Sequence, residues 1–536
     1  MKLYCKVLAI VMIFSLAACE RGEDDGSGHT FYYDLDANPR TLDPQTAVDA
    51  SSLTVITNLF EGLLRLDSEG KLVAGAATQY TVSDDGLIYE FILREDIFWT
   101  DKNGFDARCT SLDFVFAFKR LFNPATKSRN AEAYFCIKNA EAVNDSRLDL
   151  DWIGVNSDGD FKLRFVLEYP DPNFPLLLAD TPAFPCNEEF YIRSEGRYGL
   201  ITGGVPSNGA FYLSEWVYDE WWTDENRVIL KRNIKNSENE LAFPAGINFR
   251  MNRGDSYSLF ESGASDCVIL SGDKAVTLIK KNFPYDSAEN AVWGIVFDMS
   301  GGGSFLNKSD FRHALALATD RGAIDANTLG YVKTSSLIPP DVKVGEHSYR
   351  DLAGNVESAE ANTALAKAHY DKATALFGEI SSPPVIIVPS DKAILEIIGY
   401  ITQQWQEKLS FFCHIESLPP YDYNERLADG DYDLAVVKIP VSYNSPSAVF
   451  DGVFVSDETR ALYEKARFTS DAEESAALYK KAEERVIESA CVIPVCFQTE
   501  YFFRNKKSEG LIYNPFARTV NFKEGKVFKN LPNRAS

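Results

Sequence analysis

The sequence predicts an α/β protein with more than one domain. Strand-like and helix-like patterns alternate through residues 291–500, which is typical of sheets covered by helices, whereas the earlier half is more mixed. The chain has 536 residues, and a domain usually has about 100–200. A chain of this length buries enough surface to fold without disulfides or metal ions.

The composition excludes several classes of partner. The chain has 54 Lys and Arg residues against 78 Asp and Glu residues, a formal net charge of −24. Such a charge repels the phosphate backbone of nucleic acids and the surface of anionic lipids. The chain contains no run of about 18 apolar residues, so the sequence predicts no membrane span inside it.

The first residues have the pattern of a secretory signal peptide. Lys2 and Lys6 precede an apolar stretch, residues 7–18, that is too short to cross a bilayer. It ends in Leu-Ala-Ala followed by Cys19, which resembles a bacterial lipobox and implies cleavage before Cys19 and lipid attachment to that residue. We therefore expect a signal peptide at 1–18 and a lipidated, flexible tether at 19–30.

Seven cysteines remain after Cys5, which lies in the predicted signal peptide, and Cys19 are set aside, and they predict neither a metal site nor a disulfide framework. Their number is odd, no Cys-x-x-Cys pair occurs, and their spacing is unlike that of a zinc site. Buried free thiols are the simplest interpretation. The seven residues are Cys109, Cys136, Cys186, Cys267, Cys413, Cys491 and Cys496.

The earlier half contains a clear hairpin. Apolar residues alternate with polar ones on both sides of a turn at 83–86, which ends in glycine and predicts two antiparallel strands within 81–94. Residues 113–122 predict an aromatic-rich helix that ends before Asn123-Pro124. Two further strands are expected at 208–217 and 226–231.

The later half predicts alternating helices and buried strands. Ser309 and Asp310 are expected to cap a helix whose apolar stripe includes Phe311 and Leu315. Trp405 is expected to pack in the core from a helix at 391–409. The other expected elements are strands at 383–388, 411–417 and 491–495 and a helix at 473–490.

Catalytic and cofactor motifs are mostly absent. There is no His-Glu-x-x-His pair, no Walker loop and no Gly-x-Ser-x-Gly elbow. Ser271 and Lys274 match Ser-x-x-Lys, but no Lys-Thr-Gly follows, and three glycines at 301–303 favour a surface turn over a phosphate cradle. The histidines lack ligand spacing. The sequence therefore predicts no cofactor, no metal and no enzymatic activity.

Short patterns in a fixed order run along nearly the whole chain after residue 30. Each is weak alone, but their order and spacing together are specific. They are Thr41-Leu42-Asp43-Pro44, the stretch 59–63, the stretch 83–94, Asp113-Phe114-Val115-Phe116, Asn208-Gly209-Ala210-Phe211, the stretch 311–315, Asp431-Tyr432-Asp433-Leu434 and the stretch 478–483. With them the chain resembles the bacterial extracytoplasmic solute-binding proteins of family 5, the oligopeptide and dipeptide receptors of ABC importers.

The resemblance implies a clamshell of two α/β lobes, with an extra domain inserted in the first. The chain would cross between lobes near residues 290 and 500, and a ligand that touches both lobes would favour the closed state. The expected segments are 31–60, 181–290 and 501–536 for lobe I, 61–180 for the inserted domain and 291–500 for lobe II.

The resemblance also implies where a peptide would bind. Family members hold the peptide backbone by strand-like hydrogen bonds. The first-lobe strand would correspond to residues 47–51, and the second-lobe loop to residues 438–446, with Tyr421 as an aromatic wall. The implied ligand-binding residues are Val48, Ala50, Ser51, Tyr421, Lys438, Ser442, Tyr443 and Asn444.

The second-lobe loop departs from the family pattern. Many members have an Asp just before Tyr-Asn that pairs with the ammonium group of the peptide, and this position is Ser442. The frequent Trp and Cys of the same loop are replaced by Ile439 and Pro440. The ligand is therefore either a peptide whose amine is held elsewhere or a solute without that amine, such as a sugar, metal chelate, haem or cell-wall fragment.

Two broader alternatives remain from the sequence: an enzyme built on Ser271, and an adhesive surface lipoprotein. The receptor hypothesis implies a short peptide as ligand, the subunits of an ABC permease as partners, a monomer, no nucleic acid, and a lipid anchor on the periplasmic side of a bacterial cell membrane.

We predict that Ser442→Asp strengthens binding of peptides with a free amino terminus. A carboxylate there would add a charge-assisted hydrogen bond of about 1.5–3 kcal/mol, or roughly 10- to 100-fold in affinity. Isothermal calorimetry of both proteins with one peptide measures the change. An unchanged or weaker affinity would show that the loop has been misplaced.

Overall fold

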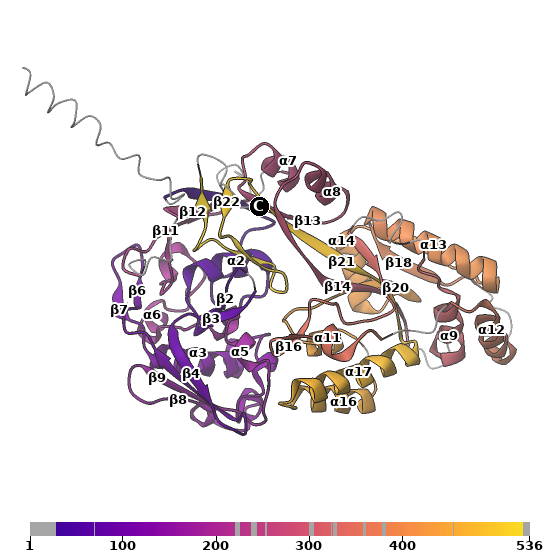
Figure 1. The fold of residues 1–536 in the computed structure, drawn as a ribbon, viewed down its shortest axis with the longest axis horizontal. Helices are drawn as coiled ribbons and strands as arrows, with labels where there is room; N and C mark the ends of the chain where they lie inside the picture. Colours follow the sequence, from indigo (N-terminus) through magenta and orange to yellow (C-terminus); the bar gives the residue numbers. More distant parts are fainter. Residues whose placement is uncertain are drawn as a thin grey trace, which may run out of the picture.

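The computed structural model describes residues 28–68, 70–219, 226–236, 244–251, 254–299, 305–322, 324, 330–356, 361–377, 382–453 and 455–528. The predicted signal peptide, Cys19 and the glycines at 301–303 lie outside these residues. The chain forms two α/β lobes side by side, as predicted (Figure 1).

Two four-stranded sheets share the first lobe. In one, β1 pairs in parallel with β12, and the other neighbours are antiparallel; the second sheet is antiparallel throughout. The order of the first is β1 (Thr30–Leu35), β12 (Gly246–Met251), β11 (Arg227–Arg232), β10 (Phe211–Val217), and that of the second is β4 (Ala77–Val82), β5 (Ile88–Leu93), β9 (Lys162–Val166), β8 (Val155–Ser157).

A single hydrophobic core joins these two sheets. Phe31 of β1 and Phe91 of β5 both lie in it, and both are fully buried. Helices and short hairpins cover it. They are α2 (Ala50–Leu59), α3 (Ser111–Phe122), α4 (Ala140–Asn144), α5 (Phe174–Leu177), α6 (Glu188–Arg193), β2 (Leu64–Leu66) with β3 (Leu72–Ala74), and β6 (Phe98–Thr100) with β7 (Asp106–Arg108).

A larger sheet of seven strands organises the second lobe. Strands β18, β19 and β20 are parallel to one another, and the remaining pairs are antiparallel. The order is β13 (Cys267–Leu270), β21 (Val492–Arg504), β14 (Tyr285–Phe297), β20 (Leu434–Pro440), β18 (Val385–Pro389), β19 (His414–Leu418), with β15 (Tyr331–Lys333) also on β21.

Helices cover both faces of this sheet, which explains its nearly continuous apolar strands. Ile386 of β18 packs with α9 and α13, whereas the next residue, Ile387, packs with Tyr423 of α14. The helices are α9 (Ser309–Ala318), α11 (Tyr349–Ala353), α12 (Thr363–Phe377), α13 (Lys392–Leu409), α14 (Pro420–Asp429), α15 (Ser447–Phe450), α16 (Asp457–Arg467) and α17 (Ala472–Ser489), with the small pair β16 (Lys343–Val344) and β17 (His347–Ser348) nearby.

The two lobes are connected through β14 and β21. These strands pair from Tyr285 opposite Phe503 to Val296 opposite Val492, with β-bulges near Ala291 and Gly294. One end of the ribbon enters the first-lobe core at Phe502, and the other end lies in the cores of the second lobe. Helices α7 (Ser256–Glu261) and α8 (Gly272–Lys280) pack beside the first-lobe end.

After β21 the chain returns to the first lobe. Asn58 of α2 donates from Nδ2 to the carbonyl of Val520 at 2.8 Å, and its Oδ1 accepts from the amide of Phe522 at 2.8 Å. The last described strands form two hairpin-like pairs, β22 (Ser508–Glu509) with β25 (Lys526–Val527) and β23 (Ile512–Asn514) with β24 (Thr519–Asn521).

Most predicted elements are confirmed, with small shifts. The hairpin with its turn at 83–86 is β4–β5, the aromatic helix is α3, and Trp405 is fully buried. The predicted N-cap of α9 was wrong, because Lys308 and not Ser309 occupies the N-cap position. The strand predicted at 491–495 is only the first part of β21, which has 13 residues and ends at Arg504. No helix within the described ranges is both long and apolar enough to cross a membrane.

One buried carboxylate orders the second lobe. Glu483 of α17 is fully buried and accepts hydrogen bonds from the amides of Leu337 and Ile338 at 2.8 and 3.0 Å. It also accepts from the hydroxyl of Tyr349 at 2.9 Å and pairs with Arg350 at 2.7 Å. The carboxylate of Glu483 therefore provides hydrogen-bond acceptors for two backbone amides of a loop and balances the charge of Arg350.

We predict that Glu483→Ala lowers the free energy of unfolding by about 3–5 kcal/mol, because it leaves a buried cation and two amides unpaired. Denaturant unfolding measures the change. Glu488→Ala, at an exposed position of the same helix, is the matched control and should stay within about 0.5 kcal/mol of the parent. Equal effects in the two variants would contradict this role.

Candidate functional site

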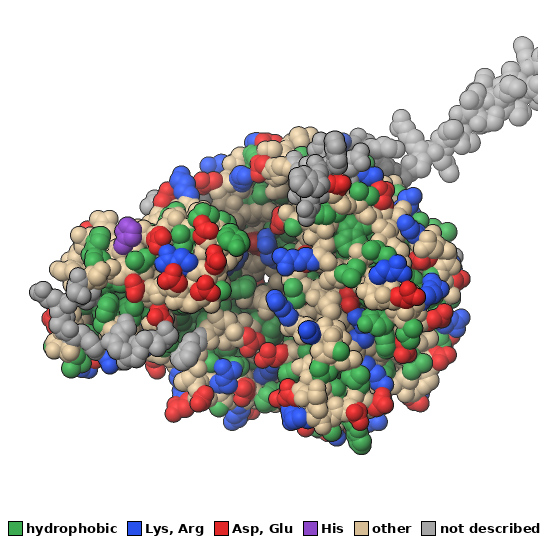
Figure 2. Space-filling view, turned by 180° about the vertical axis from the view of Figure 1, so that it is seen from behind, with side chains coloured by type: hydrophobic (Ala, Val, Ile, Leu, Met, Phe, Trp, Pro, Cys, Tyr) green, Lys and Arg blue, Asp and Glu red, His purple; other side chains and the backbone are tan. Residues whose placement is uncertain are grey.

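A cavity of about 550 Å³ lies between the lobes. Figure 2 shows the surface hollowed between the two halves, with Lys and Arg side chains beside the hollow. This volume falls within the range of about 300–1,000 Å³ that is usual for small-ligand sites. We call it the cleft cavity. Its walls come from residues 47–53, 129–134 and 177–182 of the first lobe, residues 440–467 of the second, and residues 516–518.

A buried ion pair holds part of the first-lobe wall. Arg120 of α3 donates to Asp43 at 2.5 Å and to Gln45 Oε1 at 2.7 Å, and all three side chains are buried. Asn130 donates from Nδ2 to the carbonyl of Ala47 at 3.1 Å. These contacts fix the backbone that leads to Val48, whose side chain borders the cleft cavity.

The predicted strand at residues 47–51 was wrong. Asp49 is the N-cap of α2, and its Oδ1 accepts from the amide of Ser52 at 2.9 Å, so a helix begins at Ala50. The apolar residues that follow then fall on the buried face of that helix. Because Asn130 already occupies the carbonyl of Ala47, this segment does not offer a ligand the free edge of a strand.

The second-lobe wall lies where β20 ends. Lys438 and Pro440 belong to that strand, so the expected loop begins only at residue 441. Ser442 is exposed and borders the cleft cavity beside Tyr443. The hydroxyl of Tyr443 donates to Asp451 at 2.9 Å, and burial raises the pKa of both groups.

The structure brings together four of the eight expected ligand-binding residues. Val48, Ala50, Ser442 and Tyr443 border the cleft cavity, and Ser51 borders an adjoining chamber. The other three lie outside both spaces. Lys438 is half-buried opposite Trp293, Asn444 accepts from the amide of Lys343 at 2.8 Å, and Tyr421 lies 77% exposed on α14.

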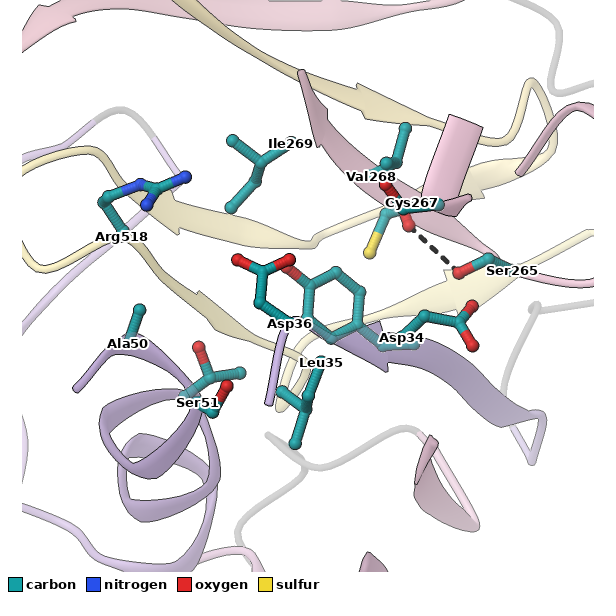
Figure 3. A pocket seen from close by; sticks show the side chains of 13 residues that line it. Asp34, Leu35, Asp36, Ala50, Ser51, Ser265, Cys267, Val268, Ile269 and Arg518 are labelled. Carbon is teal, nitrogen blue, oxygen red and sulfur yellow. Dashed lines mark hydrogen bonds between the residues drawn. The ribbon is translucent and has the colours of Figure 1, made fainter. Parts of the chain in front are cut away.

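The adjoining side chamber has a volume of about 70 Å³. In Figure 3, Ala50 and Ser51 enter it from the first turn of α2, and the side chains of Arg518 and Asp36 lie near each other. The chamber has room for a few water molecules only. Ala50 and Arg518 border both spaces, so the chamber is a side extension of the cleft cavity.

Charged residues of both signs line the cleft cavity, and the sequence analysis identified none of them. Their positions come from segments far apart in the chain, so no local pattern signals them. They are Arg129, Glu132, Asp180, Asp451, Arg467 and Arg518. Arg518 is fixed by an ion pair with buried Glu500 at 3.2 Å, and Glu500 also accepts from Asn290 at 2.7 Å and from Tyr513 at 3.1 Å.

The sequence profile of the bacterial extracellular solute-binding proteins, family 5 Middle, matches residues 71–460. The chain belongs to this family. Its members are solute receptors and not enzymes, and the same holds for this protein. Lys274 of the Ser-x-x-Lys pattern pairs with Asp255 at 2.6 Å, and Ser271 accepts from Gln498 at 3.4 Å, which are structural contacts.

Relatives cover most of this family 5 protein. The oligopeptide-binding protein OppA of Bacillus subtilis (strain 168) is 25% identical over 96% of this chain and 97% of its own. The probable deoxycholate-binding periplasmic protein YgiS of Escherichia coli (strain K12) is also 25% identical, over 87% of this chain and 88% of its own. The crystal structure of Haemophilus influenzae OppA in complex with RPPGFSPFR has a TM-score of 0.76 at 19% identity and covers 94% of this chain and 100% of its own.

Contacts across the cleft hold the lobes of the family 5 protein together. Asn173 of the first lobe is buried; it donates from Nδ2 to Ser445 Oγ at 3.1 Å and accepts at Oδ1 from the amide of Gly345 at 2.8 Å. Arg467 donates to the carbonyl of Ala133 at 2.7 Å and lies 3.7 Å from Asp171. We call these residues the clasp.

No cysteine of the described chain borders the cleft cavity. Seven cysteines lie within the described residues, outside disulfides, and six of them are buried. Burial raises the pKa of the thiols of Cys109, Cys136, Cys186, Cys267 and Cys413. The described part of the chain contains no group of His, Cys, Asp and Glu side chains suited to a metal ion.

We predict that Asn173→Ala opens the protein. The substitution removes two interlobe hydrogen bonds, each contributing about 0.5–1.5 kcal/mol, so the population of open molecules rises. Small-angle scattering of the ligand-free variant should give a larger radius of gyration than the parent. Asn144→Ala removes an amide that bonds within one lobe, to the carbonyl of Phe122, and should leave the radius unchanged. A radius equal to that of the parent in both variants would contradict the clasp.

Proposed function

We propose that this protein is the substrate-binding receptor of an ABC-type oligopeptide importer, which captures short peptides in the cleft cavity and delivers them to a membrane permease. The observation that carries the proposal is the cavity itself. It is enclosed by both lobes, and it presents three carboxylates and three guanidinium groups beside apolar wall residues. A peptide carries one ammonium, one carboxylate and a largely neutral body, so its charges complement such walls.

The relatives support this proposal. Those with 23–25% identity include oligopeptide- and dipeptide-binding proteins, and one structure of this fold is titled as Listeria monocytogenes OppA bound to peptide. A non-peptide solute is the second candidate. Ser442 lacks the charge of the family's amine-binding Asp, and the relative YgiS is named as a probable deoxycholate-binding protein.

In the proposed mechanism the two lobes close around the ligand, and no covalent bond is made or broken. The lobes, with the proposed limits of 31–60, 181–290 and 501–536 against 291–500, would move about the β14–β21 ribbon. A ligand that contacts both walls would stabilise the clasped state, and the permease would bind that state. The proposed lipid at Cys19 and tether at 19–30 would keep the receptor, as a monomer, beside the permease on the periplasmic side of a bacterial cell membrane.

We predict that the purified protein binds members of a mixed tetra- and pentapeptide library. Isothermal calorimetry should show saturable heat, and a bound peptide at 100 times its Kd should add about 2.7 kcal/mol to the free energy of unfolding. No heat and no stabilisation from any peptide, with a protein that unfolds cooperatively, would contradict a peptide ligand. Mass spectrometry of a ligand co-purified from native cells would then identify the other solute.

A further inference from the structure

Asp180 has a fixed place on the first-lobe wall of the cleft cavity. It lies between α5 and the short helical turn Thr181–Ala183. Its amide donates to the carbonyl of Leu177 at 3.2 Å, and its own carbonyl accepts from the amide of Ala183 at 3.1 Å. The backbone therefore has its partners on both sides, and the side chain borders the cavity.

The side chain of Asp180 is half-buried, and its carboxylate has no partner within the described part of the chain. Burial raises its pKa to about 7, and no hydrogen bond or cation among the described residues offsets this effect. Buried carboxylates elsewhere are paired: Asp43 with Arg120 and Asp34 with Arg250. A partly desolvated carboxylate without a partner is unfavourable, so a cation arriving in the cavity would be stabilised there.

The other two acids of the cleft cavity are less suited to an arriving cation. Asp451 already accepts from the hydroxyl of Tyr443 at 2.9 Å, and Arg467 and Arg460 partly offset the rise in its pKa that burial causes. Glu132 is exposed to solvent, where a charge pair contributes little. Asp180 is the acid whose environment changes most when a cation binds.

We propose that Asp180 binds the terminal ammonium group of the ligand and so replaces the carboxylate that the family places at Ser442. This inference rests on the proposed peptide-binding function and specifies the ligand class, a peptide with a free amino terminus. Ser442 lies on the second-lobe wall and Asp180 on the first. The amino end of the peptide would therefore be bound by the first lobe.

A matched pair of peptides tests the proposal: one tetrapeptide that binds the parent, and its N-acetylated form, which lacks the charge. The parent should bind the free-amine form more tightly by about 10- to 100-fold. Asp180→Asn should lose this preference while it binds the acetylated peptide as the parent does, which also shows that the variant is folded. Glu189→Gln, at an exposed carboxylate of the first lobe that does not border the cavity, should keep the preference.

The pH dependence gives a second measure with a defined sign. Asp180 is mostly protonated below pH 7 and ionised above it, whereas a peptide amine stays protonated up to about pH 8. Affinity for the free-amine peptide should therefore rise by about tenfold or more from pH 5.5 to 7.5 in the parent and stay flat in Asp180→Asn. The other charged groups that line the cavity are Arg129, Glu132, Asp451, Arg467 and Arg518.

The outcomes separate this proposal from the proposed function. A preference for the free amine that survives in Asp180→Asn, or that is lost equally in Glu189→Gln, overturns the role of Asp180 and leaves peptide binding in place. A parent that binds free-amine and acetylated peptides equally also overturns it. A parent that binds no peptide of the library overturns the proposed function and this inference together.

Discussion

Pairing between two antiparallel strands governs the architecture of this protein. The chain enters the second lobe along β14 and leaves it along β21, and the two strands pair over most of their lengths. The first-lobe end of β21 shares a core with β1, and the other ends of both strands belong to separate cores. Each lobe therefore has its own hydrophobic core, and the cleft lies between the two lobes.

Polar contacts connect this ribbon to the cleft. Glu500 is buried on β21 and is bonded to Asn290 at a bulge of β14, to Tyr513 and to Arg518, which borders the cleft cavity. On the opposite side of the cavity the clasp joins the lobes through Asn173 and Arg467. The ribbon and the clasp thus both place polar contacts beside the cleft cavity.

Much of the fold was predictable because local patterns and tertiary structure agree. The turn at 83–86, the Asn123-Pro124 pair that ends α3 and the apolar run of β18 each help to specify their own element. The order of family patterns also pointed to Ser442 and Tyr443, which border the cleft cavity. The first-lobe segment at 47–51 was predicted wrongly, because the capping strength of Asp49 outweighed an expectation based on resemblance.

The charged lining of the cleft could not be predicted in the same way. Asp180 is flanked by Ala179 and Thr181, a neighbourhood with no motif, and its place at the cleft cavity arises only when distant segments of the chain fold together. Lys438 and Asn444 show the converse case. They lie in the expected segment, but Lys438 belongs to β20, the side chain of Asn444 accepts from the amide of Lys343, and neither residue borders the cleft cavity.

The burial of the thiols has a consequence for biogenesis. The thiolate is the species that oxidises and exchanges, and its fraction falls as the pKa of the thiol rises. Of the seven cysteines within the described residues, six are buried and Cys491 is partly accessible. After folding, these thiols therefore react little with oxidants. The vulnerable interval is the one before folding is complete, when an odd set of cysteines is open to mispairing. Rapid formation of the hydrophobic cores, and not disulfide isomerisation, would then limit mispairing of these cysteines.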